Sequence, residues 1–163
     1  MEWDTQLCEA DGRGIEKAAK LLQQGEVVGL PTETVYGLAA NAYSDAAVAK
    51  IFKAKGRPQD NPLIVHIASL QRLSGVARDI PPAAYSLAEA FWPGPLTMIL
   101  PKGEKIAPSV SAGLDTVAVR MPSHPVAKRV IEACGLPLAA PSANLSGAPS
   151  PTQAAYVLAD MKG

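Results

Sequence analysis

The residues that could do chemistry in this chain stand where short runs of apolar residues end. Four such runs contain or finish in polar side chains: Thr32 to Thr34, His66, Arg120, and Ser142 with Asn144. Runs of this length with β-branched residues predict buried strands, and open α/β sheets bind ligands at the carboxyl ends of their strands. If the four strands point the same way, the four groups meet in one cleft. Antiparallel strands would separate them, and the sequence leaves both arrangements open.

The loop before the run 63–67 adds positive charge to this predicted cleft. It carries Lys55, Arg57 and Asn61, whereas the loop after Leu30 supplies one acid, Glu33. Cations and hydroxyls without a nucleophile paired to a base suit an anionic substrate and a reaction driven by positioning and charge stabilisation, as in phosphoryl or nucleotidyl transfer. The sequence contains no G-x-x-x-x-G-K-[ST], G-x-G-x-x-G, G-x-S-x-G or H-E-x-x-H motif.

Each of these residues also has an ordinary structural explanation. A single buried histidine such as His66 is more often a satisfied core residue than a functional one. The stretch from Ser150 to Gln153 is a capping box with proline at the first helical position, so we expect a helix to begin there with amides suited to a phosphate. Such boxes are in most cases only caps. The functional interpretation therefore depends on the groups lying together.

Composition indicates one globular domain. The chain has 163 residues, of which 48% are hydrophobic and 18% charged, and its formal net charge is zero. No apolar run approaches the roughly 20 residues that span a bilayer, and the acidic N-terminus is unlike a signal peptide, so we expect a cytoplasmic protein. Zero net charge argues against a general attraction to nucleic acid or membrane. Cys8 and Cys134 are expected to be small buried apolar residues.

The spacing of apolar residues, together with the positions of glycine and proline, predicts the helices and strands that position these groups. Helices are expected over 15–24 with Gly25 as cap, from Ser44 or Asp45 to about Gly56, over most of 69–92 with a break at Pro81-Pro82, over 124–134 with Ser123 as cap, and from Pro151. Strands are expected over 27–30, 63–67, 96–100, 116–121 and 136–140. Residues 92–95 predict a rigid turn, residues 101–114 a long surface loop, and Phe91 and Trp92 core positions.

Four segments together resemble the YrdC/Sua5 family of L-threonylcarbamoyladenylate synthases. They are PTETVYGLA at 31–39, KAKGRPQDNPLIVHI at 53–67, RMP at 120–122 and PSANLSGAPSPT at 141–152. The resemblance spans nearly the whole chain, and its Lys-x-Arg and Ser-x-Asn elements in this order are highly specific. It implies an α/β fold in which a twisted open sheet of mixed strands, flanked by helices, surrounds a central basic cleft.

The resemblance also implies a reaction. The family joins L-threonine, bicarbonate or CO2, and ATP to give threonylcarbamoyl-AMP and pyrophosphate, which makes it a nucleotidyltransferase acting in the t6A modification of tRNA. Mg2+ is implied with the triphosphate, held mainly by phosphate oxygens. A downstream threonylcarbamoyl transferase is the implied partner, and contact with tRNA or another double-stranded RNA is left open.

Matching the motifs residue by residue implies a role for each site residue. The catalytic cations would be Lys55 and Arg57. Threonine would be bound by Thr34, His66, Arg120 and Ala140. ATP would be bound by Arg57, Asn61, Thr116, Ser142, Asn144 and Ser150.

The family domain usually continues beyond the helix expected at Pro151. We therefore expect residues 1–163 to be a single YrdC-like catalytic domain truncated at its C-terminal end. Two other functions stay open. One is that of a relative that makes carbamoyl-AMP from carbamoyl phosphate, and the other is a non-catalytic RNA-binding module that uses the same basic concavity.

Overall fold

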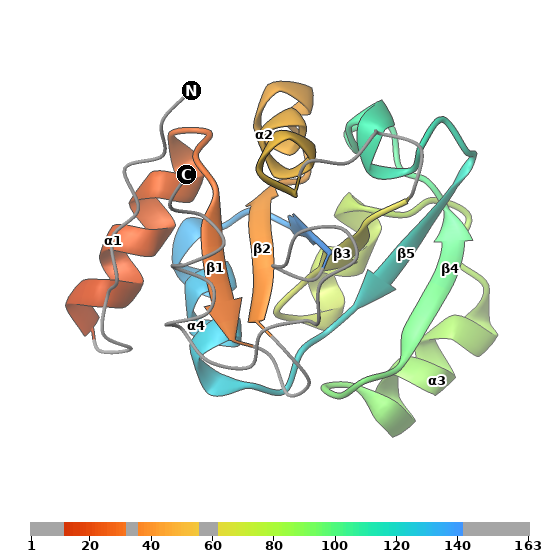
Figure 1. The fold of residues 1–163 in the computed structure, drawn as a ribbon. Helices are drawn as coiled ribbons and strands as arrows, with labels where there is room; N and C mark the ends of the chain where they lie inside the picture. The colour runs from red at the N-terminus through yellow and green to blue at the C-terminus, as the bar shows by residue number, and fades with distance from the viewer. Residues whose placement is uncertain (1–11, 32–35, 56–61, 142–163) are drawn as a thin grey trace.

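The computed structural model describes residues 12–31, 36–55 and 62–141 of the chain (Figure 1). Six strands form one sheet in the order β1-β2-β6-β3-β5-β4. The strands are β1 Val28–Pro31, β2 Tyr36–Asn41, β3 Ile64–His66, β4 Thr97–Pro101, β5 Thr116–Arg120 and β6 Leu138–Ala140. The helices are α1 Gly12–Gln23, α2 Asp45–Lys55, α3 Pro82–Phe91 and α4 Pro125–Cys134, with 3-10 turns η1 Leu70–Gly75 and η2 Pro108–Val110.

The sheet is mixed, as the family resemblance implies. Strands β3 and β5 are parallel, whereas β6 pairs antiparallel with both β3 and β2, and β1 pairs antiparallel with β2. Strands β1 and β6 therefore run opposite to β3 and β5. The condition that all four polar-ended strands point the same way is not met, because neighbouring antiparallel strands finish at opposite ends of a sheet.

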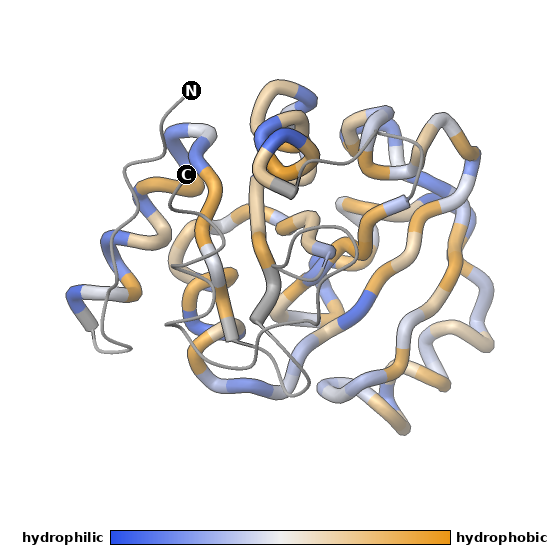
Figure 2. Tube along the Cα trace, viewed as in Figure 1, coloured by the Kyte–Doolittle hydropathy of each residue, from blue (hydrophilic) through white to orange (hydrophobic). Residues whose placement is uncertain are grey.

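Register partners lie on the same face of a sheet, so the alternation of side chains defines two faces. On one face Val65, Val119, Met98 and Ala139 join the larger apolar core with helices α2 and α3. On the other face β6 presents Leu138 and Ala140 to a second core, which contains residues of α1 and α4. We call this second side of the sheet the α4 face. Figure 2 shows the apolar residues running through the strands between these helical layers.

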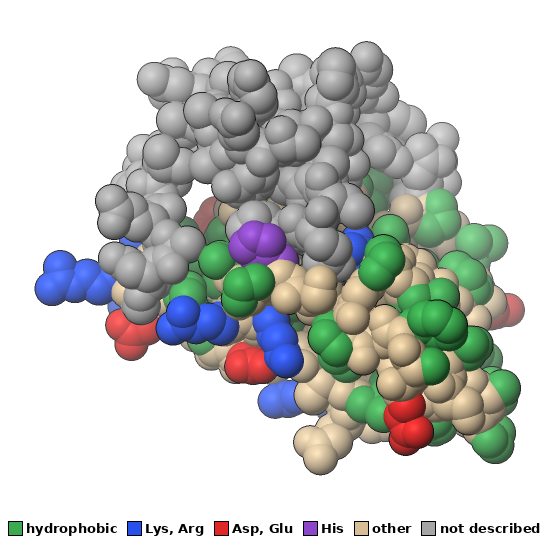
Figure 3. All heavy atoms as spheres, turned by 90° about the horizontal axis from the view of Figure 1, so that it is seen from below, with side chains coloured by type: hydrophobic (Ala, Val, Ile, Leu, Met, Phe, Trp, Pro, Cys, Tyr) green, Lys and Arg blue, Asp and Glu red, His purple; other side chains and the backbone are tan. Residues whose placement is uncertain are grey.

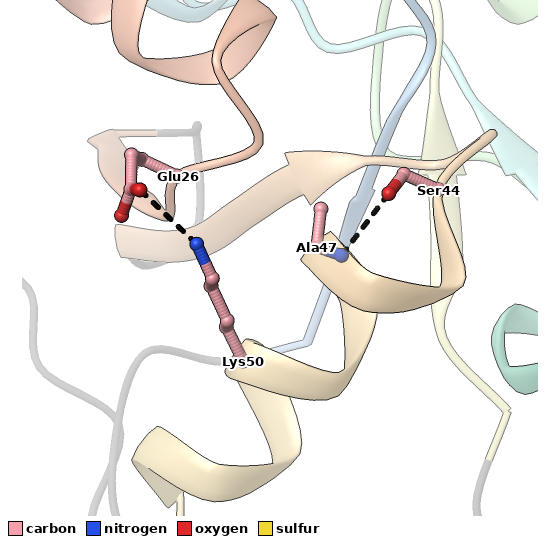
Figure 4. A network of polar contacts seen from close by, with 4 residues as sticks. All are labelled: Glu26, Ser44, Ala47 and Lys50. Atoms are coloured by element: carbon pink, nitrogen blue, oxygen red, sulfur yellow. Dashed lines mark hydrogen bonds and ion pairs between the residues drawn. The ribbon is translucent and has the colours of Figure 1, made fainter. Parts of the chain in front are cut away.

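Helix α2 begins where the sequence predicts it. Ser44 Oγ accepts a hydrogen bond of 3.1 Å from the backbone N–H of Ala47, so Ser44 is the N-cap (Figure 4). Such a cap contributes about 1 kcal/mol. One turn later Lys50 Nζ lies 3.1 Å from Glu26 Oε1, which ties α2 to the residues before β1. That pair is partly exposed and stabilises the fold by at most about 1 kcal/mol.

Helix α4 begins one residue later than predicted. Its N-cap is His124, whose Nδ1 accepts a hydrogen bond of 3.2 Å from the N–H of Val126. The sequence predicted Ser123, but the ring nitrogen of the next residue satisfies the orphan amide instead. Helix α1 ends as predicted, because Gly25 has a φ of +84° and donates its N–H to Leu22.

Three expectations are wrong. Phe91 is 58% exposed, and only its neighbour Trp92 joins the core. The segment 101–114 is not a surface loop, because it buries Ile106, Ala107 and Val110, and forms η2. Strand β1 lies at the edge of the sheet, and its Val28 and Gly29 are only partly buried, so it is not the buried strand that the sequence predicts. Within the described ranges, no helix has the length and hydropathy needed to cross a membrane.

Candidate functional site

His66 and Arg120 are direct register partners on the parallel strands β3 and β5. Adjacent strands lie about 4.8 Å apart, so the two side chains leave the α4 face as neighbours. Both residues are buried, with 7% and 8% of their surface exposed. A histidine ring and a guanidinium from two central strands therefore share one patch of this face.

Ala140 belongs to the same face. It pairs with Ile64 on β3, while Leu138 pairs with His66. Ala140 therefore lies two residues along β6 from the partner of the histidine, on the same face. A small cavity of about 10 Å³ lies at this place, lined by Leu30, Ala39, His66, Pro122, Ala127, Ile131, Leu138 and Ala140. That volume holds about one water molecule or a group of similar size. Because the other lining residues are alanine, leucine, isoleucine or proline, the histidine is the polar member of an apolar wall.

The side chain of Arg120 is hydrogen-bonded to the turn that precedes β4. Its Nε donates a hydrogen bond of 3.2 Å to the carbonyl oxygen of Gly94. Thr97, the first residue of β4, is its register partner on the other side. A guanidinium anchored through Nε carries its terminal amino groups in a defined plane, which suits fork-like recognition of a carboxylate.

Thr116 lies at the far end of the same face. It begins β5, four residues before Arg120, and pairs with Pro101 on β4. At ~3.3 Å per residue, the two side chains leave the face about 13 Å apart. Thr116 is exposed, so the face runs from a buried arginine–histidine pair to an exposed hydroxyl.

The sheet thus has two ends, between which the predicted site residues are divided. The His66 end contains Asn41, His66, Thr97, Arg120 and Leu138, and the Ala140 end contains Pro31, Tyr36, Ile64, Thr116 and Ala140. Leu38 donates its N–H to Pro141, which keeps the β1–β2 hairpin beside the end of β6. Of the two arrangements that the sequence left open, the four strands therefore adopt the one that separates their carboxyl ends. What joins the described residues is a shared face.

Several predicted site residues lie outside the described residues: Thr34, Arg57, Asn61, Ser142, Asn144 and Ser150. Lys55 is the last residue of α2, and its side chain also lies outside them. The described strands nevertheless fix where these segments connect. The segment 32–35 joins Pro31 to Tyr36, the segment 56–61 leads into β3, and residue 142 follows β6. All three connect at the Ala140 end of the sheet.

The predicted basic cleft depends on these undescribed cations and stays a prediction. Seen from below, the described basic side chains gather on the side of α1 and α4, and apolar side chains on the side of α3 (Figure 3). The exposed basic residues of these two helices are Arg13, Lys17, Lys20 and Arg129. Among residues 12–31, 36–55 and 62–141, no group of three or more His, Cys, Asp or Glu side chains is placed to hold a metal ion.

Cys134 at the end of α4 is buried, as the sequence predicts, and burial raises the pKa of its thiol above its ordinary value. In the unfolded chain the thiol loses its proton at a lower pH, so the contribution of this group to stability is fully present below about pH 8.5 and declines as pH rises. We expect the stability advantage of the native chain over Cys134→Ala to shrink by up to about 1.4 kcal/mol per pH unit above that point. Urea unfolding at pH 7 and pH 10 measures it, and a pH-independent difference contradicts it.

Sequence reasoning missed one contributor to the site, the carbonyl of Gly94. The sequence predicts a rigid turn over 92–95 but gives no sign that this turn touches Arg120. The signal that could have found it is topological. The turn leads directly into β4, and a strand that follows a turn of this kind commonly pairs with the next strand along the chain.

The chain is similar to known proteins both in sequence and in fold. The Sua5/YciO/YrdC family model, described as telomere recombination, matches residues 20–163. The threonylcarbamoyl-AMP synthase of Pyrococcus abyssi is 56% identical over 149 residues, which are 91% of this chain and 44% of that protein. The synthase of Bacillus subtilis is 57% identical over 150 residues, covering 91% of this chain and 43% of that protein. The crystal structure of P. abyssi Sua5 complexed with L-threonine has a TM-score of 0.89 at 54% identity, and covers 95% of this chain and 45% of that one.

The chain therefore spans less than half the length of these relatives. The family model nevertheless matches most of the chain, and the mixed six-stranded sheet agrees with the solved structure across nearly all of it. By sequence and by fold, this chain belongs to the Sua5/YciO/YrdC family.

Proposed function

We propose that the chain is the catalytic domain of an L-threonylcarbamoyladenylate synthase, a nucleotidyltransferase that makes threonylcarbamoyl-AMP and pyrophosphate from L-threonine, bicarbonate or CO2, and ATP. The observation that carries the proposal is the placement of His66, Arg120 and Ala140 on one face, two of them as direct register partners. The similarity to curated synthases at 56% and 57% identity supports it. Residues 1–163 would form one YrdC-like domain.

On this proposal the described residues bind threonine. Arg120 forks onto the carboxylate, because a planar guanidinium matches the two oxygens of a carboxylate. His66 hydrogen-bonds the threonine hydroxyl, and the apolar wall that includes Ala140 receives the methyl group. A relative at 54% identity, P. abyssi Sua5, was crystallised in complex with L-threonine, which supports threonine as the amino acid that is bound. Thr34 would complete the threonine site from the loop after β1.

The nucleotide would occupy the Ala140 end of the sheet. Thr116 is exposed there, and the segments that carry the other ATP contacts connect there: Arg57, Asn61, Ser142, Asn144 and Ser150. The roughly 13 Å between the positions of Arg120 and Thr116 gives room for an amino acid followed by a phosphate. ATP would enter with its Mg2+ bound to the phosphates, so the ion belongs to the substrate.

The reaction joins two anions. The threonine amine attacks CO2 and loses a proton, which gives a carbamate. A carbamate oxygen then attacks the α-phosphorus, the bond from that phosphorus to the bridging oxygen breaks, and pyrophosphate leaves. Lys55 and Arg57 would neutralise the charge on the phosphates, because preorganised cations stabilise such a transition state without reorganising.

The product would pass to a threonylcarbamoyl transferase that modifies tRNA in the cytoplasm. Contact between this chain and tRNA or another double-stranded RNA belongs to the same proposal. The chain spans less than half the length of its curated relatives. We therefore propose these partners for proteins of the relatives' full length.

Pyrophosphate release tests the proposal. The purified chain with MgATP should release pyrophosphate only when both L-threonine and bicarbonate are present, and carbamoyl phosphate should not replace them. Release driven by carbamoyl phosphate would instead indicate the carbamoyl-AMP activity. Absence of release, together with RNA binding that weakens steeply with salt and ignores ATP, would indicate the RNA-binding module.

A further inference from the structure

We propose that Gly94 is a positioning residue for threonine recognition, because its peptide orients the guanidinium of Arg120. The inference rests on the proposed function, in which Arg120 binds the carboxylate of threonine. The turn that contains Gly94, residues 92–95 between α3 and β4, would then be part of the amino-acid site although it contributes no side chain to the face.

Gly94 holds the Arg120 region at two points. Its carbonyl oxygen accepts from Arg120 Nε at 3.2 Å. Its N–H donates to the carbonyl oxygen of Met121, the next residue along the chain, at 2.8 Å. Gly94 thus hydrogen-bonds both the side chain of Arg120 and the backbone of Met121. A shift of this peptide must move the arginine, the end of β5, or both.

The turn itself is fixed by the core. Trp92 is buried, and its backbone N–H donates to Ala88 in α3 at 2.8 Å. Its indole Nε1 donates to the carbonyl oxygen of Leu96 at 2.8 Å, which closes the turn across Gly94. A buried aromatic residue with its polar atom satisfied is a rigid support. The carbonyl of Gly94 is therefore a fixed acceptor.

The chemistry of arginine explains why this anchor affects binding. The side chain has several rotatable bonds, and ordering it on binding reduces affinity. A hydrogen bond at Nε fixes the plane of the guanidinium before the substrate arrives, and leaves the terminal amino groups at the outer edge of that plane. Preorganisation of this kind raises affinity without adding a contact to the ligand.

Only glycine fits at position 94. A Cβ built there would lie 2.7 Å from the backbone oxygen of Phe91, a distance that real Cβ atoms essentially never show. The obstacle is backbone rather than a flexible side chain, so an alanine must displace the turn. Because the displaced peptide carries the acceptor for Arg120, the effect of the substitution should reach the threonine site.

The main test is the L-threonine Kd of Gly94→Ala, measured by calorimetry. We expect that Kd to rise about tenfold or more, while the ATP Kd stays within about twofold. The matched control is Gly135→Ala at the C-cap of α4. Gly135 has a φ of +69° with nothing within 4 Å of a built Cβ, so alanine strains only the local backbone. It should lower the melting temperature and leave both Kd values unchanged.

A double-mutant cycle separates positioning from general damage. In an Arg120→Lys background there is no Nε to hold, so Gly94→Ala should weaken threonine binding no further. If Gly94→Ala fails to fold, Trp92→Phe replaces it, since this variant keeps an aromatic ring but loses the donor to Leu96. It should shift the threonine Kd in the same direction by a smaller factor. Additive effects in the cycle, or a threonine Kd within twofold of the native value in the single variant, would overturn the proposal.

A spectroscopic measurement tests the anchor without substrate. The Arg120 Nε–H signal, identified by its loss in Arg120→Lys, should exchange slowly with solvent in the native chain and rapidly in Gly94→Ala. Rapid exchange in the native chain would overturn the anchor directly. If the native chain binds no threonine while this proton is protected, the proposed function is wrong, and the anchor stands on the exchange result alone.

Discussion

L-Valine should drive pyrophosphate release at least about 10³-fold less efficiently than L-threonine, compared as kcat/KM. Valine has nearly the shape of threonine but carries a methyl group in place of the hydroxyl. His66 is buried and stands in a wall of alanine, leucine, isoleucine and proline side chains. A bound valine would leave the polar ring facing a methyl group, and a buried polar group that loses its partner is costly.

L-Serine separates the hydroxyl from the methyl group. It keeps the hydroxyl and lacks only the methyl, whose burial contributes about 0.8 kcal/mol, so its efficiency should fall only about three- to tenfold. The assay is pyrophosphate release with the three amino acids at saturating MgATP and bicarbonate. Equal efficiency for valine and threonine would remove His66 from the proposed hydroxyl contact, whatever the effect of serine.

The sequence predicted which residues form strands better than how the strands run. The runs that became β3, β5 and β6 are apolar because most of their side chains are buried. An apolar run reads the same in either chain direction, so its pattern contains no information about parallel or antiparallel pairing. The sequence therefore left open whether the four polar groups meet at one end of the sheet. Strand β2 was not predicted because its Gly, Leu and Ala residues have weak strand preference and are ordered by pairing with β1 and β6.

The candidate site could be predicted in part. His66 and Arg120 were found because each interrupts or ends an apolar run, and their neighbourhood follows from the parallel pairing of β3 and β5. Ala140 came only from the family resemblance, since a small residue in an apolar strand has no chemistry of its own. Gly94 escaped because its contribution is a carbonyl oxygen, and backbone contacts depend on how a turn is placed rather than on residue type.

Two wrong expectations have the same physical cause. Phe91 was assigned to the core on its residue type, yet it is exposed at the last position of α3, although it follows the buried Ala84 and Ala88 at helical spacing. The segment 101–114 was assigned to the surface on its prolines and glycines, yet Leu63 N–H bonds the carbonyl of Val110 and Ala107 N–H bonds that of Ala42. In both cases tertiary packing decides burial, and local composition does not.

Arg120→Lys should raise the Kd for L-threonine about 10²-fold and change the ATP Kd by less than about threefold. The lysine keeps the positive charge but loses the planar fork, which carries two parallel hydrogen bonds to a carboxylate. It also loses Nε, so the bond of 3.2 Å to Gly94 disappears with the guanidinium. A hydrogen bond to a charged group contributes about 1.5–3 kcal/mol, and a loss of about 2.7 kcal/mol corresponds to the expected factor.

The matched control is Arg129→Lys on α4. Arg129 is exposed on the outer side of that helix, so its substitution tests the loss of a guanidinium without touching the α4 face of the sheet. It should leave the threonine Kd unchanged within about twofold. Calorimetric titration of the three chains gives both Kd values, and a melting curve for each shows whether the fold is intact. A threonine Kd for Arg120→Lys within twofold of the native value would mean that charge alone suffices at position 120. The planar fork of the guanidinium, and its anchor on Gly94, would then not be what recognises the carboxylate.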